Sequence, residues 1–326
     1  KKTLINYHKF LKKCQKSTVD FSLSIKDDFI SPFARCSWIF GINSIKQNFL
    51  LEQLKNDLVS SIILDLKKLR KKIGSEEKAL KLKSYKQLLC FSLSALNLLD
   101  KSSLIELKDE VLEQCSVDIE NFLNKFGTDT GKAGSGNHAM FLAKFLIVGN
   151  DNFNLNSDIK ISKWINYHKE KINTQGFWGE TKNLTHLQFQ NGYHQYEIFH
   201  YLNIFTGYEK NIVSNLLKIA DCNGQFAPYP GGGGCYDYDA IFLICSYAKN
   251  QADEKLKFLL LKTLNTIVLN QNSDGGFSEN NWVRPISINK FIYGLKKCFQ
   301  NASGYEIILE RLKYLATLQR KKNNQI

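Results

Sequence analysis

The sequence lacks several features that would assign it to a membrane or secreted class of protein. No apolar run in its 326 residues reaches the ~18 residues that a membrane span needs. The basic start of the chain, residues 1–13, is not followed by the long apolar stretch of a secretory signal. None of the eight cysteines forms a Cys-x-x-Cys pair, and several lie in apolar helical patterns, where a thiol behaves as a small hydrophobe. These absences predict a reduced, cytoplasmic protein without a transmembrane segment.

Acidic residues are scarce relative to basic ones. The chain has 44 lysines and arginines against 31 aspartates and glutamates, a formal net charge of +13. Such an excess favours an anionic partner, among them a diphosphate, a uronic polysaccharide, a nucleic acid or a membrane surface. The densest basic patch, Leu66–Lys72, lies at the end of a helical pattern and is typical of a solvated helix C-terminus. No nucleic-acid-binding signature accompanies it, so we expect no specific nucleic-acid binding.

No segment alternates polar and apolar residues as a strand would, and from residue 45 onward helical spacing recurs instead. The predicted helices are 45–72, 76–99, 103–126, 137–148, 159–172, 191–206, 209–220, 237–249, 253–271, 285–299 and 304–319. Residues 1–43 give one short helical pattern, a break at Ser31-Pro32 and an apolar cluster around Trp38. The sequence therefore predicts an all-α protein.

A Gly-x-aromatic pattern occurs three times, at Gly176–Trp178, Gly224–Phe226 and Gly275–Phe277, with the glycines 48 and 51 residues apart. Each copy follows a charged helical pattern and precedes a loop into a nearly apolar one, and a helix that is apolar all round is buried. The pattern predicts helix-pair repeats of about fifty residues. In such a repeat the glycine permits a tight turn, and Trp178, Phe226 and Phe277 are buried at the repeat junctions.

The best copy of the repeat resembles a known family motif. Residues 264–277 end in Gln-Asn-Ser-Asp-Gly-Gly-Phe, which is similar to the Q-x-x-D-G-G-[FW] repeat of squalene and oxidosqualene cyclases and of protein prenyltransferase β-subunits. The matching residues are Gln271, Asp274, Gly275, Gly276 and Phe277. The resemblance covers roughly residues 120–300 and implies an α/α toroid with inner and outer helix layers. It divides the chain into an N-terminal segment, 1–43, packing on the toroid, and a toroid domain, 44–326.

The resemblance to these enzymes stops short of their chemical motifs. A D-x-D-D motif protonates the polyene in the cyclases, and Asp237-Tyr238-Asp239 matches it except that Ala240 stands at the last position. The prenyltransferases hold zinc with a D-x-C pair and a later histidine. In this chain Cys235 precedes Asp237, and no histidine follows His200. Polysaccharide lyases, unsaturated glucuronyl hydrolases and sugar epimerases use the same toroid, so the fold limits the function without choosing it.

Three glycine-containing loops lead into apolar helical patterns, and each carries a histidine or aspartate at the first helical turn. These residues are His138, His194 and Asp237. Equivalent positions in successive repeats of a toroid converge on the central cavity, so we predict that they are catalytic, with Asp239 as a further carboxylate. Alternatively, the histidines only cap helices or donate to carbonyls. His168 is predicted to be exposed.

No cofactor is predicted, although a divalent metal is possible. The weak candidates for metal ligands are His138, His194, Cys235 and Asp237, whose atom types suit zinc but whose spacing is not a recognised motif.

Aromatic side chains crowd the same predicted mouth. The candidate substrate-binding residues are Tyr193, Tyr196, Trp178, Tyr229, Tyr236, Tyr238 and Arg284. Tyrosines at a polar rim suit sugar stacking or the stabilisation of a cation, and they equally suit an interface. Arg284 follows the last repeat turn, where it could neutralise an anionic substrate.

Three classes of function are compatible with this sequence. The preferred one is a terpenoid cyclase/prenyltransferase-like enzyme with a central cavity for an isoprenoid, because the matching residues are that family's. The alternative is a carbohydrate-active toroid of the polysaccharide lyase, epimerase or uronyl hydrolase type, with His and Tyr as base and acid on an anionic glycan. The third is a non-catalytic toroid that binds a glycan or a protein.

Overall fold

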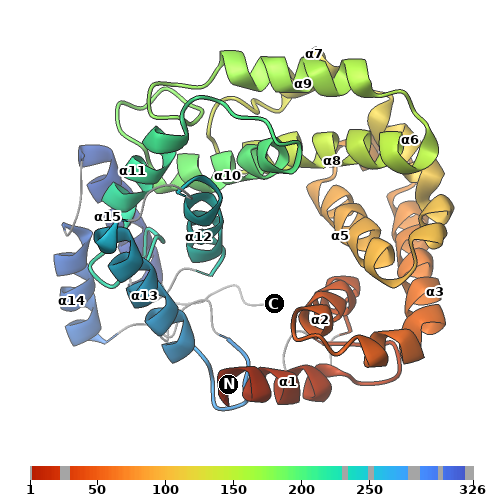
Figure 1. The fold of residues 1–326 in the computed structure, drawn as a ribbon, viewed down its shortest axis with the longest axis horizontal. Helices are drawn as coiled ribbons and strands as arrows, with labels where there is room; N and C mark the ends of the chain where they lie inside the picture. The colour runs from red at the N-terminus through yellow and green to blue at the C-terminus, as the bar shows by residue number, and fades with distance from the viewer. Residues whose placement is uncertain are drawn as a thin grey trace. The chain divides into compact units, whose positions relative to one another are not determined.

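A computed structural model of the protein describes residues 2–22, 30–229, 234–248, 253–277, 287–299 and 304–319, and their regular structure is helical (Figure 1). Within these ranges the only β-type pairings are two isolated bridges, Gln15 with Phe21 and Gln271 with Phe277. The all-α prediction is therefore confirmed. No helix in these ranges combines the length and the apolar character needed to span a membrane.

The chain divides into two compact units. The first unit comprises residues 1–122, 141–164 and 272–276, and the second comprises residues 123–140, 165–271 and 277–326. Helices of the first unit are α1 (Lys2–Cys14), α2 (Pro32–Ser44), α3 (Asn48–Ile73), α4 (Glu76–Lys81), α5 (Lys83–Leu99), the 3₁₀ helix η1 (Lys101–Leu107) and α6 (Lys108–Cys115). Three helices have residues in both units, namely α7 (Ile119–Lys125), α8 (Ser135–Phe153) and α9 (Asp158–Glu170). Helices of the second unit are α10 (His186–Tyr201), α11 (Glu209–Ile219), α12 (Cys235–Tyr247), α13 (Glu254–Leu269), α14 (Ile288–Cys298) and α15 (Tyr305–Gln319).

The predicted helices differ from the observed ones mainly in the first unit. The break expected at Pro32 is instead the start of α2, because proline fits the first helical turn, where its missing N–H has no intrahelical partner. The predicted helix 76–99 is two helices, separated at Leu82, whose backbone is extended. The predicted helix 103–126 is divided among η1, α6 and α7.

The three repeat turns share one backbone conformation. Gly176, Gly224 and Gly275 have φ of 84°, 74° and 97°, a region that favours glycine. In each turn the glycine N–H donates to the carbonyl three residues earlier, at 2.9, 3.0 and 3.0 Å. The N–H of that earlier residue donates to the carbonyl of the residue after the glycine, at 2.8, 2.9 and 2.8 Å. The prediction of helical repeats is thus confirmed at the level of this turn.

Another helix closes over each turn at the glycine. A Cβ at Gly176 would lie 3.0 Å from the Tyr208 Cβ, and one at Gly224 would lie 2.8 Å from the Thr263 hydroxyl of α13. A Cβ at Gly275 would collide with the carbonyl oxygen of Asn6, which belongs to α1 in the same unit. Glycine is therefore required both by its φ and by the approach of a neighbouring segment.

Burial of the repeat aromatics follows the prediction in two copies and not in the third. Trp178 and Phe226 are both 0% exposed. Phe277 is 42% exposed, so the prediction that it is buried was wrong. In the third turn it is Gly275 and Gly276, rather than the aromatic side chain, that meet α1.

Candidate active site

Two helices of the second unit, α10 and α12, pack against each other and carry most of the predicted site residues. α10 begins with a capping box, in which the Thr185 hydroxyl accepts from the Gln188 N–H and the Gln188 side chain accepts from the Thr185 N–H. The Glu310 carboxylate accepts from the next two backbone amides of α10, at 2.7 and 2.9 Å. A carboxylate at this end of a helix is stabilised by the helix dipole, so the start of α10 is firmly fixed.

Asp239 of α12 is the most unusual ionisable group at this interface. Its side chain is buried, with 3% of the residue exposed. Its Oδ2 atom has no hydrogen-bond partner within the described part of the chain. Burial, and after it the nearby charge of Glu197 on α10, raises the pKa of the Asp239 carboxyl to about 8. The carboxyl therefore holds a proton at neutral pH.

Aromatic rings pack against one another at the same interface of α10 and α12, and Tyr193 among them lies near enough to Asp239 to feel its charge. The Tyr193 ring lies 6.0 Å from the Tyr238 ring and 5.4 Å from the Phe242 ring, edge to face in both pairs. His200 packs edge-on against Phe242 at 5.4 Å. Burial, followed by the charges of Glu197 and other neighbours that include Asp239, raises the pKa of Tyr193, so its hydroxyl also stays protonated. Tyr238 is 60% exposed, which leaves this aromatic face open to solvent on one side.

Asp237 lies two residues before Asp239 and contacts a different part of the unit. Its Oδ1 accepts a hydrogen bond of 2.7 Å from the Phe226 N–H, and it too is only 3% exposed. Burial raises the pKa of Asp237 to about 6, while the bond from Phe226 opposes that rise. Residues two apart on a helix point in different directions, so Asp237 anchors the second repeat turn and Asp239 meets α10.

The two predicted catalytic histidines lie on helices that approach each other closely. A Cβ on Gly136 at the start of α8 would collide with the Asn191 carbonyl of α10. The His194 Nε2 lies 2.9 Å from the Asn137 side-chain nitrogen, which donates to it because an amide NH₂ has no lone pair to offer. His138, the next residue, stacks on the Phe126 ring at 4.1 Å. Among the described residues, no group of three or more His, Cys, Asp or Glu side chains is arranged to hold a metal ion.

Two predicted substrate-binding residues are core residues of the first repeat turn. Trp178 is fully buried, and its indole N–H donates to the His168 carbonyl at 2.9 Å. Tyr196 is fully buried too, and its hydroxyl donates to the Gly176 carbonyl. His168 was wrongly predicted to be exposed. It is 0% exposed and lies 3.2 Å from the Thr128 hydroxyl.

The remaining predicted residues make other contacts or lie outside the described ranges. Tyr236 is 7% exposed, and its ring lies 5.7 Å from Phe189 and 6.1 Å from Tyr229. Cys235, the first residue of α12, is exposed. Arg284 lies outside the residues that the structure describes.

A buried polar network on the Asp237 side of α12 was not predicted. The His186 Nδ1–H donates to the Phe226 carbonyl at 2.7 Å, and the Arg311 Nε donates to the His186 Nε2 at 3.4 Å. Burial lowers the pKa of His186 to about 3, and the Arg311 charge adds to this effect. Arg311 also donates to the Ile219 carbonyl at 2.6 Å. Because His186 and Arg311 are far apart in sequence, no local sequence pattern predicts the network.

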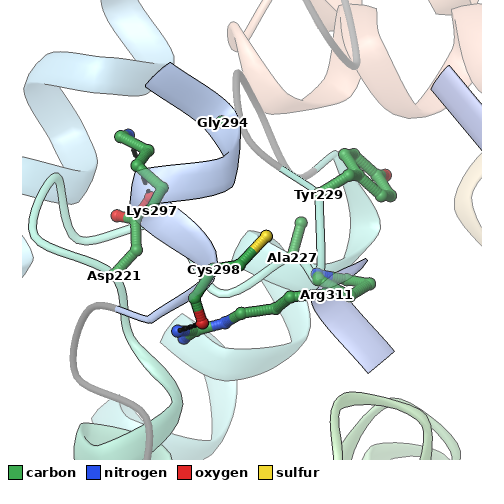
Figure 2. A pocket seen from close by; sticks show the side chains of 8 residues that line it. Asp221, Ala227, Tyr229, Gly294, Lys297, Cys298 and Arg311 are labelled. Atoms are coloured by element: carbon green, nitrogen blue, oxygen red, sulfur yellow. Dashed lines mark hydrogen bonds and ion pairs between the residues drawn. The ribbon is translucent and has the colours of Figure 1, made fainter. Parts of the chain in front are cut away.

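Arg311 of this network also lines a cavity of about 10 Å³, too small for a substrate. Figure 2 shows Asp221 and Lys297 joined beside it, with Arg311 extended toward the Cys298 carbonyl. The Lys297 ammonium lies 3.1 Å from the Asp221 carboxylate, and both side chains are buried. The network therefore has a structural role, whereas Asp239 and its aromatic face are the better candidates for chemistry.

Sequence reasoning also missed Glu197, which raises the pKa of Asp239. Glu197 stands four residues after Tyr193 on α10, so the two share a helix face, and that spacing was the available signal.

Comparison with known proteins finds no matching family model, no similar curated protein and no similar solved structure. The case for a function therefore rests on the site itself.

Proposed function

We propose that the protein is an enzyme in which Asp239 donates a proton to the substrate. The observation that carries the proposal is the buried Asp239 carboxyl, whose Oδ2 has no hydrogen-bond partner in the described residues and whose pKa is raised to about 8. A general acid works best when its pKa lies near the operating pH and its proton is not already committed to a neighbour. Glu197 helps to keep that proton on Asp239, because two like charges at close range are unfavourable.

The preferred substrate is an isoprenoid, which would make the enzyme terpenoid cyclase-like. Protonation of a carbon–carbon double bond by Asp239 would leave a carbocation on the substrate. The ring faces of Tyr193, Tyr238 and Phe242 are suited to stabilise such a cation. Asp239 is also the last residue of the D-x-D that resembles the acid motif of that family.

The proposal includes the α/α toroid with a central active-site cavity. Its support is the shared conformation of the three repeat turns and the way another segment closes over each of them. α11 and α13 donate side-chain hydrogen bonds to the first and second turns through Asn215 and Thr266, at 2.9 and 3.2 Å. α1 meets the third turn at Gly275, as expected if the first helix of the chain completes a ring.

A carbohydrate-active enzyme is the second candidate, and the pairing of Asp239 with Glu197 favours it. Glycoside hydrolysis uses two carboxyl groups, one protonated and one ionised, and the raised pKa of Asp239 suits the first of these roles. The Tyr193 hydroxyl, which is protonated beside them, could serve as an acid in a lyase.

The test compares the wild-type protein with Asp239→Asn and Asp237→Asn on both substrate classes. Squalene and farnesyl diphosphate are assayed for cyclised products by mass spectrometry, and uronate polysaccharides are assayed for new chain ends. We expect isoprenoid turnover that falls about 10²–10⁴-fold in Asp239→Asn, the usual contribution of a general acid. Asp237→Asn is the matched control, because an amide oxygen still accepts from Phe226.

Each other outcome bears on a different part of the proposal. Polysaccharide cleavage that depends on Asp239 would replace the isoprenoid by a glycan. Unchanged turnover in Asp239→Asn would remove the general acid. Failure of the wild-type protein to convert either class would count against both enzymatic candidates.

A further inference from the structure

An open pocket of about 410 Å³ lies in the second unit, away from the Asp239 face. Its lining comes from the second repeat turn, α13 and α14, and from neither α10 nor α12. The lining residues that the argument uses are Gln225, Lys262, Asn270, Tyr293 and Lys297. A volume of this size suits a small ligand.

Two side-chain amides that line this pocket have no protein partner in the described residues. Gln225 is 2% exposed and Asn270 is 7% exposed. Within the described part of the chain neither side-chain amide makes a hydrogen bond, and both line the pocket. Neither amide is among the enclosed unpaired atoms of the described residues, so both reach the open pocket, where they can donate to and accept from a ligand.

The preceding repeat shows that these polar residues are not demanded by the fold. Gln225 stands where Phe177 stands in the first turn, 48 residues earlier, and Asn270 stands where Ile219 stands, 51 residues earlier. Both Phe177 and Ile219 are fully buried core residues. Each of these two positions is therefore apolar in the repeat before its own and an amide at the place where the pocket opens.

Comparison with the preceding repeat also shows that the pocket has gained a positive charge, at Lys262. Lys262 stands 51 residues after Asn211, and both donate to a turn carbonyl, Lys262 to that of Cys222 at 3.1 Å and Asn211 to that of Thr174 at 2.9 Å. The Lys262 ammonium also lies 4.5 Å from the Phe258 ring, and no carboxylate in the described ranges pairs with it. The repeat has thus exchanged a neutral amide for a cation.

Lys297 adds a second ammonium at the other side of the pocket. It is paired with Asp221 at 3.1 Å, and the other oxygen of Asp221 accepts from the backbone N–H groups of Asn223 and Gln225. The Asp221 charge is therefore already compensated, and no aspartate or glutamate is among the described lining residues. The electrostatic balance favours a ligand that carries negative charge.

We propose that this pocket binds a small phosphorylated sugar or polyol. The phosphate oxygens accept from Lys262 with Lys297 nearby, since a lysine ammonium suits a compact dianion. The hydroxyl groups pair with the amides of Gln225 and Asn270, which can donate and accept. The site is independent of proton donation by Asp239, because the two share no residue.

Calorimetric titration of the full chain at constant ionic strength tests this assignment. The probes are glucose-6-phosphate, inorganic phosphate, glucose and glucuronate. We expect glucose-6-phosphate to bind more tightly than inorganic phosphate. Glucose, which is uncharged, and glucuronate, which carries a carboxylate, should both bind far more weakly than glucose-6-phosphate. Lys262→Gln removes the ammonium that has no carboxylate partner in the described ranges and is expected to weaken glucose-6-phosphate binding about tenfold or more. Lys257→Gln is the matched control, since this exposed lysine of the same helix pairs with Glu254 instead.

A second variant, Asn270→Ile, restores the residue type of the preceding repeat. It is expected to fold at least as stably as the wild type while losing affinity for glucose-6-phosphate over inorganic phosphate. The assignment is overturned if none of the four probes binds, or if glucose or glucuronate binds as tightly as glucose-6-phosphate. It is equally overturned if Lys262→Gln and Lys257→Gln weaken binding by the same factor, because that would indicate only a general attraction to a basic protein.

Discussion

The two sides of α12 differ in how their polar groups are satisfied. Asp237 and Asp239 are equally buried, at 3% exposed each. Asp237 accepts a hydrogen bond from the Phe226 N–H. His186, 40 residues away in sequence, donates to the Phe226 carbonyl, and Arg311, a further 125 residues from His186, donates to the His186 ring. The Oδ2 of Asp239 has no hydrogen-bond partner in the described residues, and the charge of Glu197 acts on its carboxyl.

This difference teaches that burial alone does not identify a chemical group. Burial raises the pKa of both aspartates, but to about 6 where a backbone N–H stabilises the charged form and to about 8 where a second carboxylate opposes it. Hydrogen bonds therefore stabilise the fold on the Asp237 side, whereas on the Asp239 side the carboxyl stays protonated and its Oδ2 has no hydrogen-bond partner in the described residues. Three predictions sharpen or break this contrast.

The largest effect is expected on the Asp237 side. Arg311→Met leaves the His186 Nε2 and the Ile219 carbonyl without their donor in a buried site, and should lower the free energy of unfolding by about 3–5 kcal/mol. Tyr238→Ala on the open side, where the residue is 60% exposed, should cost about 1 kcal/mol or less. Urea unfolding at pH 7 measures both. A larger loss in Tyr238→Ala than in Arg311→Met would reverse the contrast.

A pH-dependent effect is expected from Asp239. Its folded-state pKa of about 8 lies above the ordinary value near 3.9, so its contribution to stability is full below about pH 4 and is lost as the pH rises through 8. Between pH 5 and pH 9 this loss amounts to up to about 4 kcal/mol. The midpoint temperature of thermal unfolding should fall less steeply with rising pH in Asp239→Asn than in the wild type. Parallel curves for the two proteins would mean that Asp239 titrates normally.

The smallest effect concerns the Asp237 anchor. Asp237→Ala leaves the buried Phe226 N–H without an acceptor and should cost about 1–3 kcal/mol at pH 7. Asp237→Asn keeps an acceptor oxygen and should cost less. Equal losses in the two variants, measured by chemical unfolding, would show that the bond to Phe226 is not what holds this side together.

Local features of the fold were well predicted from the sequence. Helices followed from apolar periodicity, and the three turns at Gly176, Gly224 and Gly275 followed from the Gly-x-aromatic repeat. Errors arose where a neighbouring segment decides the outcome. Phe277 is exposed because its turn meets α1 through glycines, and His168 is buried beneath contacts with Thr128 and Trp178.

The candidate site was predicted in part. The sequence singled out Asp237 with His138 and His194, named Asp239 only as a further carboxylate, and did not include Glu197. It also placed Trp178 and Tyr196 at a substrate mouth, where the structure places them in the core of the first repeat turn. The catalytic roles of His138 and His194 and the toroid itself stay predictions.

The sequence by itself determined the helical class, the repeat turns and the residue types available for chemistry, because helix periodicity and the φ of glycine are local properties. Only the tertiary structure decided which aspartate is hydrogen-bonded and which keeps its proton. It also decided that the side-chain amides of Gln225 and Asn270 reach one pocket beside Lys262 without a protein partner. The physical reason is that a pKa and an unsatisfied amide both depend on burial and on neighbours brought from other helices, which no local pattern encodes.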